Sequence, residues 1–258
     1  MEFNLGFAEA NNRAFKESDA TLLAVLNPDA FPEPEWLEQL VSESQLYPDV
    51  AAFGSKQMMY EGNGLLDGVG DVYHISGIAW RSGVGKMSSA RNELPGEIFS
   101  ACAAGALYRA EVLKEVGGFD EDYFCYLEDV DLGFRLRLAG YSARYVPSAV
   151  VHHIGSATSG GRRSDFSLYH GHRNLVWTFV KNMPGFLFWL LLPVLLTQII
   201  ILISVCVFRG NIKVLLRSYL IAIKGLPRMW RKRKKIQGKR VAPVSDIWKV
   251  LDKSFFRD

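Results

Sequence analysis

The sequence predicts an α/β domain followed by a helical and strongly apolar C-terminal segment. Apolar runs of strand length, such as 21–26 and 143–153, alternate with stretches of helical periodicity, such as 34–46 and 128–139. The chain has 258 residues, of which 49% are hydrophobic, and this is enough for a substantial core. The uncharged run over 186–208 departs sharply in composition from everything before it.

The expected elements alternate along the chain. Pro34 lies near a helix start, and the apolar side chains after it share one helical face, which predicts a helix over 34–46. Residues 60–96 are rich in glycine and lack periodicity, so hairpins and loops are expected there. The other expected elements are a helix over 7–18, strands over 21–26 and 50–54, helices over 109–116 and 128–139, and a strand over 143–153 that ends at two histidines.

The segment 124–135 carries the densest chemical signal. Glu128, Asp129 and Asp131 place three carboxylates within four residues, directly after an aromatic run. At a helix start, Glu128 and Asp131 share one face and Asp129 points elsewhere. Carboxylates this close raise at least one pKa unless a cation or the positive end of a helix is near. The pattern indicates a general base, alone or beside a metal, and a solvated acidic helix start is the alternative.

A second acidic signal comes directly after the apolar run 21–26. The turn Asn27-Pro28-Asp29 places Asp29 where the strand ends, and open α/β sheets bind ligands at that edge. A carboxylate there can hold Mg²⁺ or Mn²⁺, and the metal can hold a substrate pyrophosphate. The same three residues also form an ordinary turn.

Short stretches with recognisable spacing occur in a fixed order along the chain. They are Asn4–Asn12, Leu26–Asp29, Ser100–Ala106 with Val116–Glu121, Glu128–Asp131, Val151–Ser156, and His170–Asn174 with Lys181–Gly185. Together they resemble glycosyltransferase family 2, the inverting transferases with the GT-A fold, and the last pair resembles rhamnosyltransferase-like members. The resemblance covers most of the chain. It implies a GT-A-type, Rossmann-like mixed sheet.

The resemblance also implies a reaction and the residues that carry it out. A sugar, with rhamnose as a candidate, moves in a single displacement from a nucleotide-sugar donor to a glycan or lipid-linked acceptor. Asp129 is implied as the base that deprotonates the acceptor hydroxyl. Glu128 and Asp131 are implied to shape its surroundings.

The donor side is implied by the same resemblance. Asp29 and His153 are implied as ligands of a divalent metal, Mg²⁺ or Mn²⁺, on the donor diphosphate, and His152 is the rival of His153. Asn11, Asn27, Asp29 and Arg173 are implied in donor binding, although Arg173 fits a helix-surface cation equally well. The loop 156–165, which contains two arginines, is expected either to close over the donor or to be a disordered basic loop.

The chain departs from the family pattern at its N-terminus. Family members open with a strand-helix-strand unit that holds the nucleotide, and residues 1–12 already match a later part of the family pattern. We therefore expect an incomplete sheet with exposed edges. A fragment, a misassigned start and a separate N-terminal partner are the explanations left open, and so is a homo-oligomer. The alternative functions are a non-catalytic remnant or subunit and a basic membrane-surface binding protein.

The C-terminal part predicts membrane association. The uncharged segment 186–208 is long enough to span a bilayer, and the basic region 228–240 suits anionic lipid headgroups. Nucleic acid is not expected, because no nucleic-acid-binding module is recognised. The expected division is a transferase domain over 1–180, a membrane segment with a basic amphipathic region over 181–240, and a tail over 241–258.

The expected location is the cytoplasmic face of a membrane. Three scattered cysteines form no disulfide framework, which fits a reducing compartment. A single crossing would place the basic region outside, against the positive-inside rule. Because Pro193 and Gln198 interrupt the apolar run, a re-entrant or in-plane segment is favoured, with the catalytic domain on the cytoplasmic side.

Overall fold

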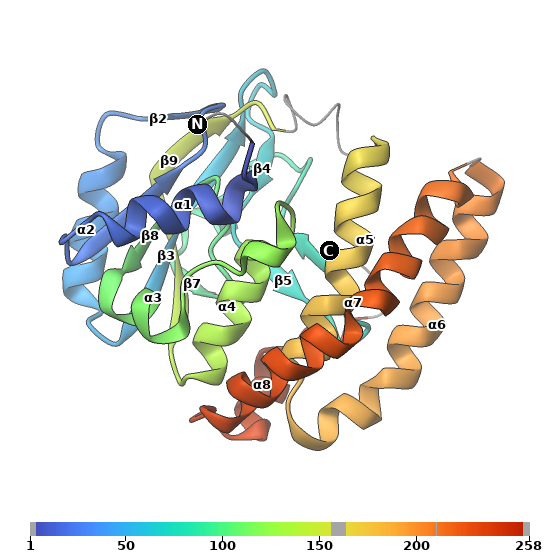
Figure 1. Ribbon diagram of the computed structural model, residues 1–258. Helices are drawn as coiled ribbons and strands as arrows, with labels where there is room; N and C mark the ends of the chain where they lie inside the picture. The colour runs from blue at the N-terminus through green and yellow to red at the C-terminus, as the bar shows by residue number, and fades with distance from the viewer. Residues whose placement is uncertain (1–3, 156–163, 210, 255–258) are drawn as a thin grey trace.

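The computed structural model describes residues 4–155, 164–209 and 211–254. A mixed sheet carries helices on both faces, and a group of long helices packs beside it (Figure 1). In chain order the elements are α1 Gly6–Lys16, β1 Leu22–Leu26, β2 Ala30–Pro32, α2 Trp36–Leu46, β3 Val50–Met59, β4 Leu66–Gly68, β5 Asp71–Tyr73, β6 Ala79–Arg81, η1 Ala90–Glu93, β7 Gly96–Ile98, β8 Gly105–Arg109, α3 Ala110–Val116, η2 Glu121–Tyr123, α4 Glu128–Leu138, β9 Ser142–His153, α5 Asp165–Asn182, α6 Gly185–Arg209, α7 Ile212–Gly238 and α8 Val244–Val250.

The main sheet has seven strands, and five of them form the order β1-β8-β3-β9-β2. The β3–β9 pair is parallel, whereas β1–β8, β3–β8 and β2–β9 are antiparallel. β4 pairs with β3 and β7 with β9, and β5 and β6 form a separate two-stranded ribbon. Among the described residues, β1 is therefore an edge of the sheet.

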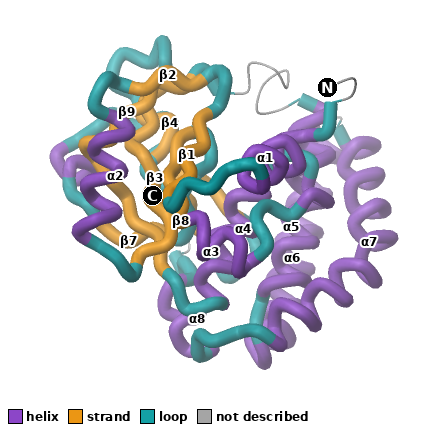
Figure 2. The backbone as a smooth tube through the Cα atoms, turned by 60° about the vertical axis from the view of Figure 1, so that its left-hand side comes forward, coloured by secondary structure: helices purple, strands orange, loops and turns teal. Residues whose placement is uncertain are grey.

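Alternating side chains of the central strands fill two cores, because successive residues of a strand point to opposite faces. Ala52 of β3 packs with α1, α3 and α4 on one face. Phe53, the next residue, packs with Trp36 and Leu40 of α2 on the other face. The indole of Trp36 also donates a hydrogen bond to Ser55 of β3 at 2.7 Å. Both faces are therefore closed by helices, as the tube in Figure 2 also shows.

A third and larger core joins the sheet domain to the C-terminal helices. It contains buried side chains from Tyr73 in β5, from α4 to α8, and from Leu251 beyond α8. The expected domain boundary near residue 180 falls inside α5, and this core lies on both sides of it. α7 packs against α5, and the indole of Trp177 in α5 donates to the carbonyl of Ala222 in α7 at 3.0 Å.

The periodic elements lie where the sequence predicts them, and the largest difference is in β3. A strand over 50–54 is expected, but β3 continues to Met59. The extension pairs with β4 and with the end of β9, which brings His153 beside Met59. Pairing with distant strands therefore lengthens a strand whose own apolar pattern ends at Gly54.

The expected interruption of the apolar segment is wrong. α6 is one continuous helix of 25 residues with Pro193 inside it. A proline removes one intrahelical hydrogen bond, and the strong helix formers on either side carry the helix past it. No hairpin forms within 186–208 in this structure, and how α6 lies relative to a membrane stays a prediction. The helix has a mean hydropathy of 2.7 over Gly185–Val207 and is long enough to cross a membrane.

The basic region is only partly directed to solvent. Lys232 pairs with Asp120 and Asp122, and Arg228 pairs with Asp122. Arg233 is buried and donates to the carbonyls of Val180 and Met183. The exposed cations of the run 231–235 are Arg231, Lys234 and Lys235. About half of this charge run therefore holds α7 on the domain.

Candidate active site

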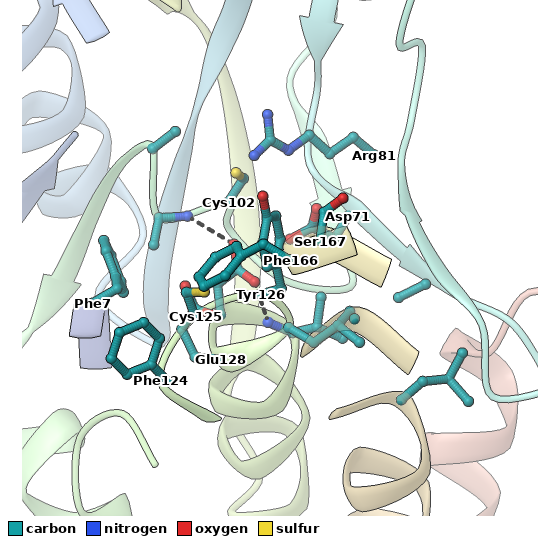
Figure 3. A pocket seen from close by; sticks show the side chains of 18 of the residues that line it. Phe7, Asp71, Arg81, Cys102, Phe124, Cys125, Tyr126, Glu128, Phe166 and Ser167 are labelled. Carbon is teal, nitrogen blue, oxygen red and sulfur yellow. Dashed lines mark hydrogen bonds between the residues drawn. The ribbon is translucent and has the colours of Figure 1, made fainter. Parts of the chain in front are cut away.

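A cavity of about 940 Å³ opens between the end of the sheet and the start of α4. Its volume lies in the range of sites for small organic ligands. Figure 3 shows side chains from distant parts of the chain around it, among them Asp71, Arg81 and Glu128. The polar residues of the lining include Asn27, Asp29, Asp71, Arg81, Glu128 and Asp129, and also Asn4, Ser167 and His172.

Asp29 and His153 come together because β2 pairs with β9. Ala30 lies opposite His153 in that pair, and Ile154 donates its backbone N–H to the carbonyl of Asp29 at 3.0 Å. The Nε2 atom of His153 is 3.2 Å from Oδ1 of Asp29, and its Nδ1 atom is 2.8 Å from Oδ2 of Asp67. The imidazole is buried, and the carboxylates of Asp29 and Asp67, one at each ring nitrogen, fix its orientation.

These atoms fit a divalent cation. If Nδ1 donates its proton to Asp67, the lone pair of Nε2 faces an oxygen of Asp29, and two acceptors need a proton or a cation between them. A carboxylate behind the imidazole is the usual support of a metal-binding histidine. Among the described residues, no group of three or more His, Cys, Asp or Glu side chains could hold a metal. Further ligands would have to come from donor oxygens and water.

The turn before α4 is strained. Phe124, Tyr126 and Leu127 have φ angles of 65°, 66° and 64°, in the left-handed region that residues other than glycine rarely adopt. Phe124 has ψ of −61°, and Cys125 donates to the carbonyl of Tyr123 at 2.8 Å, which is the rare γ-turn. Each such residue costs about 1–3 kcal/mol and persists only when its surroundings hold it.

Asn174 of α5 is the main support of this turn. Its side-chain nitrogen donates to the carbonyls of Tyr123, Cys125 and Tyr126 at 3.2, 2.9 and 2.7 Å. The residue is fully buried. Arg173, the preceding residue, donates to the carbonyl of Tyr123 at 2.7 Å. Both side chains therefore face the strained backbone.

The N-terminal end of α1 braces the same turn from the other side. Phe7 donates its backbone N–H to the carbonyl of Phe124 at 2.7 Å. Gly6 has φ of +81°, and a Cβ atom there would lie 2.6 Å from the ring of Phe124. Only glycine fits this approach without displacing the ring. The start of α1 and the turn before α4 therefore form one wall of the cavity.

Asp129 is presented to the cavity by the first turn of α4. Its Oδ2 accepts the backbone N–H of Ala103 at 3.2 Å, and its Oδ1 accepts that of Val130 at 2.8 Å. The helix start favours negative charge at this position. Glu128 is buried, and burial raises its pKa well above the usual value, with the nearby charge of Asp129 adding to the effect. Its Oε2 has no hydrogen-bond partner among the residues that the structure describes.

Asp131 lies away from the cavity in a buried charge network. Its Oδ1 is 2.7 Å from the ammonium of Lys181 and also accepts from Asn182 at 2.7 Å, and its Oδ2 accepts from Arg135 at 2.9 Å. Burial alone would raise the pKa of Asp131, but Lys181 and Arg135 hold it below its usual value. The residue joins α4 to α5, and it does not contribute to the cavity lining.

Of the other residues implied in donor binding, the structure places some in the cavity lining and others outside it. Asn27 lines the cavity, and its side-chain oxygen is buried without a hydrogen-bond partner. Asn11 bonds within α1 to the carbonyl of Phe7 at 2.9 Å and lies outside the lining. Arg173 faces the turn before α4 and lies outside it too. His152 is half exposed and contacts Glu33 at 3.3 Å, so His153 is the histidine beside Asp29.

Two polar residues of the cavity have no motif that marks them in the sequence. Asp71 accepts a hydrogen bond from Ser100 at 2.9 Å, and burial and Asp129 raise its pKa well above the usual value. Arg81 pairs with Asp67, and it is the one Arg or Lys among the described lining residues. Both lie in three-residue strands within 60–96, too short for a periodic pattern. The arginine loop expected over 156–165 lies mostly outside the described residues.

The fold is similar to that of a solved GT-A-fold structure. The crystal structure of GalNAc-T7 with UDP, GalNAc and Mn²⁺ superposes with a TM-score of 0.54 over 70% of this chain and 35% of that chain, at 13% sequence identity. The mixed α/β sheet resembles that of GT-A-fold transferases.

The family is established by the sequence match. Residues 22–209 match the model of glycosyl transferase family group 2, so the chain belongs to this family. It is 35% identical over 165 residues to the O-antigen biosynthesis protein RfbC of Myxococcus xanthus, which covers 60% of this chain. It is 49% identical over 65 residues, 25% of this chain, to N-acetylglucosaminyl-diphospho-decaprenol L-rhamnosyltransferase of Mycobacterium tuberculosis. The aligned parts are 12% and 21% of those two proteins.

Proposed function

We propose that the chain transfers a sugar, with inversion, from a nucleotide-sugar donor to a glycan or lipid-linked acceptor of the cell envelope. The observation that carries this proposal is that Asp29 and Asp129 line the same cavity from opposite elements. We assign Asp29 to the donor diphosphate and Asp129 to the acceptor hydroxyl. The relatives act in O-antigen biosynthesis and as a rhamnosyltransferase, which supports an envelope glycan and makes rhamnose a candidate sugar.

The donor side is assigned to the end of β1 and the residues around it. Asp29 and His153 would hold a divalent metal, Mg²⁺ or Mn²⁺, which would offset the charge of the leaving diphosphate. The solved GalNAc-T7 complex contains Mn²⁺, which supports this choice. Arg81 is positioned to contact the diphosphate, and the unpaired oxygen of Asn27 to accept a donor hydroxyl.

The acceptor side is assigned to the start of α4. Asp129 takes the proton of the acceptor hydroxyl as that oxygen attacks the anomeric carbon opposite the leaving group. The two backbone N–H groups on its carboxylate hold that group in place. Glu128, whose raised pKa favours the neutral form, adds little repulsion beside it. Asp131 acts indirectly, by fixing α4 to α5.

Asp129→Asn tests the assignment. Transfer should fall by at least about 100-fold, the usual contribution of a general base, while donor binding persists. Transfer is measured with labelled nucleotide sugars and an envelope glycan extract, and donor binding by calorimetry. Asp49→Asn, at an exposed position, is the matched control and should behave as wild type. Wild-type turnover in the Asp129→Asn protein would overturn the role of this carboxylate.

The membrane role is a proposal as well. One helix passes the length and composition test for a membrane span, and only 17% of that window is buried. We assign α6 to a lipid surface, with Arg231, Lys234 and Lys235 available to anionic headgroups. The catalytic domain then lies on the cytoplasmic side.

A non-catalytic subunit is the second candidate, and the edge strand β1 favours it. All five residues of β1 are apolar, as in strands that are covered on both sides, yet Leu26 is 38% exposed. Its outer edge pairs with no strand among the described residues. A subunit that needs a strand from another polypeptide should bind no nucleotide sugar alone and should gain binding when that polypeptide is added. Donor binding by the chain alone would exclude this candidate.

A further inference from the structure

Aromatic side chains form part of the cavity lining. Figure 3 shows Phe124, Tyr126 and Phe166 among the residues that line it. Phe166 lies in the first turn of α5, and the other two lie in the strained turn before α4. Tyr126 precedes Asp129 by three residues, and Asp129 lines the same cavity. These rings therefore lie close in the chain to the carboxylate that we assign to the acceptor hydroxyl.

The rings contact one another and form an aromatic cluster of Phe124, Tyr126, Phe166 and His170. The centroid of the Phe166 ring is 6.3 Å from that of Phe124 and 6.2 Å from that of Tyr126, both in edge-to-face geometry, which aromatic pairs favour. The imidazole of His170 is 4.5 Å from the Phe166 ring and is stacked on Phe124 at 5.4 Å. Burial, together with the charge of Arg173, lowers the pKa of His170 to about 4. The aromatic cluster therefore carries no charge at neutral pH.

Two members of the aromatic cluster support the other two. Phe124 is held between the His170 ring and the start of α1, where a Cβ atom at Gly6 would lie 2.6 Å from the Phe124 ring. Phe166 rests on Phe124 and His170, and 40% of its surface is still exposed. Tyr126 is half-buried. Phe166 and Tyr126 therefore keep ring surface that a ligand in the cavity can contact.

The backbone of the turn indicates that the rings themselves have a role. Phe124 and Tyr126 have φ angles of 65° and 66°, which glycine adopts most easily. For the backbone alone, glycine would be the better residue at both positions, yet each carries a large aromatic side chain. Strained residues of this kind gather at ligand-binding sites, where the surrounding structure holds them. The turn therefore favours a ligand that contacts these aromatic side chains.

The chemistry of the lining fits a sugar ring. The face of an aromatic ring carries partial negative charge, so it attracts the polarised C–H groups of a sugar and offers nothing to an anionic diphosphate. A pyranose has C–H groups on its faces and hydroxyl groups around its edge. The cavity combines exposed aromatic surface with the carboxyl groups of Asp71 and Asp129, which can bind hydroxyl groups. The nucleobase of the donor is the other flat group that stacks on aromatic side chains.

We propose that Phe166 and Tyr126 bind the face of the acceptor's terminal sugar, a pyranose, and orient its hydroxyl toward Asp129. This proposal rests on the proposed function and names residues that select its acceptor. The sugar would then lie between the first turn of α5 and the start of α4. We favour the acceptor over the nucleobase because Tyr126 leads into the helix that carries Asp129, whereas the donor diphosphate is assigned to Asp29.

The test measures glycan binding and donor binding separately, in the full chain. Fluorescently labelled oligosaccharides released from the envelope glycan extract are the probe, and fluorescence anisotropy gives their Kd. Phe166→Ala should raise this Kd about tenfold, at the upper end of what one aromatic contact contributes, and Phe166→Trp should stay within about threefold of wild type. Tyr47→Ala is the matched control, because Tyr47 is 39% exposed at the end of α2 and lies outside the lining. It should bind the oligosaccharides as wild type does.

Two more variants separate the aromatic faces from apolar volume and from the backbone. Phe166→Leu keeps an apolar side chain without the aromatic face, and it should weaken oligosaccharide binding as Phe166→Ala does. Tyr126→Gly suits a φ angle of 66°, so it removes the ring without straining the turn, and it should also weaken binding. In transfer assays, Phe166→Ala should raise the KM for the oligosaccharides and leave the KM for the nucleotide sugar unchanged.

Four results would overturn the proposal. They are wild-type affinity in Phe166→Leu, wild-type affinity in Phe166→Ala, a Phe166→Ala protein that loses affinity for the nucleotide sugar in place of the glycan, and a wild-type chain that binds no labelled oligosaccharide. Transfer that depends on Asp129, together with any of the first three, would leave the proposed function standing. Ring-dependent glycan binding without transfer would support the role of Phe166 and count against the proposed function.

Discussion

Replacing Asn174 by alanine should destabilise the turn that leads into the start of α4. The change removes an NH2 group whose two protons are shared among three buried carbonyls, and an oxygen that accepts a hydrogen bond from Arg173. At about 1 kcal/mol for each of the two donated bonds and the accepted one, the free energy of unfolding should fall by about 3 kcal/mol. For a chain of this size that corresponds to a drop of about 6–12 °C in Tm. The strained φ angles of Phe124, Tyr126 and Leu127 can then relax, because the turn keeps only its contacts with Arg173 and with the start of α1.

Catalysis should fall even under conditions in which the variant is fully folded. A turn that relaxes shifts Asp129 relative to the donor, and a displacement of about 1 Å costs about 100-fold in rate. Urea unfolding monitored by tryptophan fluorescence gives the stability, and kcat under fully folded conditions gives the activity. Asn11→Ala removes a single hydrogen bond within α1 and should cost about 1 kcal/mol or less. Equal stability of the two variants, with kcat unchanged in Asn174→Ala, would refute the supporting role of Asn174.

Three other predictions concern the charged groups. Transfer should stop in EDTA and return with Mn²⁺ or Mg²⁺, and Asp29→Ala and His153→Ala should each raise the metal concentration for half-maximal rate; full activity after chelation would contradict this. Burial raises the pKa of Glu128 in the folded protein. The stability that the neutral Glu128 side chain contributes is therefore complete below the ordinary carboxyl pKa and is lost as pH rises through the pKa of the folded state. In urea titrations Glu128→Gln should therefore gain more stability over wild type at pH 8 than at pH 5, and a stability difference that does not change with pH would contradict this prediction. Lys181→Met should lower the free energy of unfolding by about 3–5 kcal/mol, since it breaks a buried ion pair and leaves Arg135 as the remaining cation on Asp131, and a loss under about 1 kcal/mol would show that Arg135 is sufficient.

The sequence predicts those parts of the molecule whose pattern is local. The strand β1 and the helices α2 and α4 are long enough for periodicity to show, and each lies within two residues of its expected range. Asp29 is recognisable because a turn ends its strand. Asp71 and Arg81 are not, because they lie in three-residue strands, whose position depends on pairing with distant segments.

The basic region shows why charge patterns alone are ambiguous. Lys232 and Lys235 are equivalent in the sequence, within one dense run of cations. Only the fold shows that Lys232 faces Asp120 and Asp122, whereas Lys235 faces solvent. The partners of Lys232 are more than a hundred residues upstream, so no local rule distinguishes a cation that supports the fold from one that is free for lipid. The same ambiguity applies to Asp131, because the sequence pattern does not distinguish it from its neighbour Asp129.

The pairing of Lys232 with Asp120 also constrains how the protein is made. The two residues are 112 positions apart, so α7 leaves the ribosome well after Asp120 does. Until it does, the carboxylates of Asp120 and Asp122 lack those cations, and the turn after them lacks part of its support. Chains generally begin to fold from the N-terminus during synthesis. The support of the turn before α4 would then be completed only after α7 has been made, and truncation within α7 should weaken that support while leaving every residue of the cavity in place.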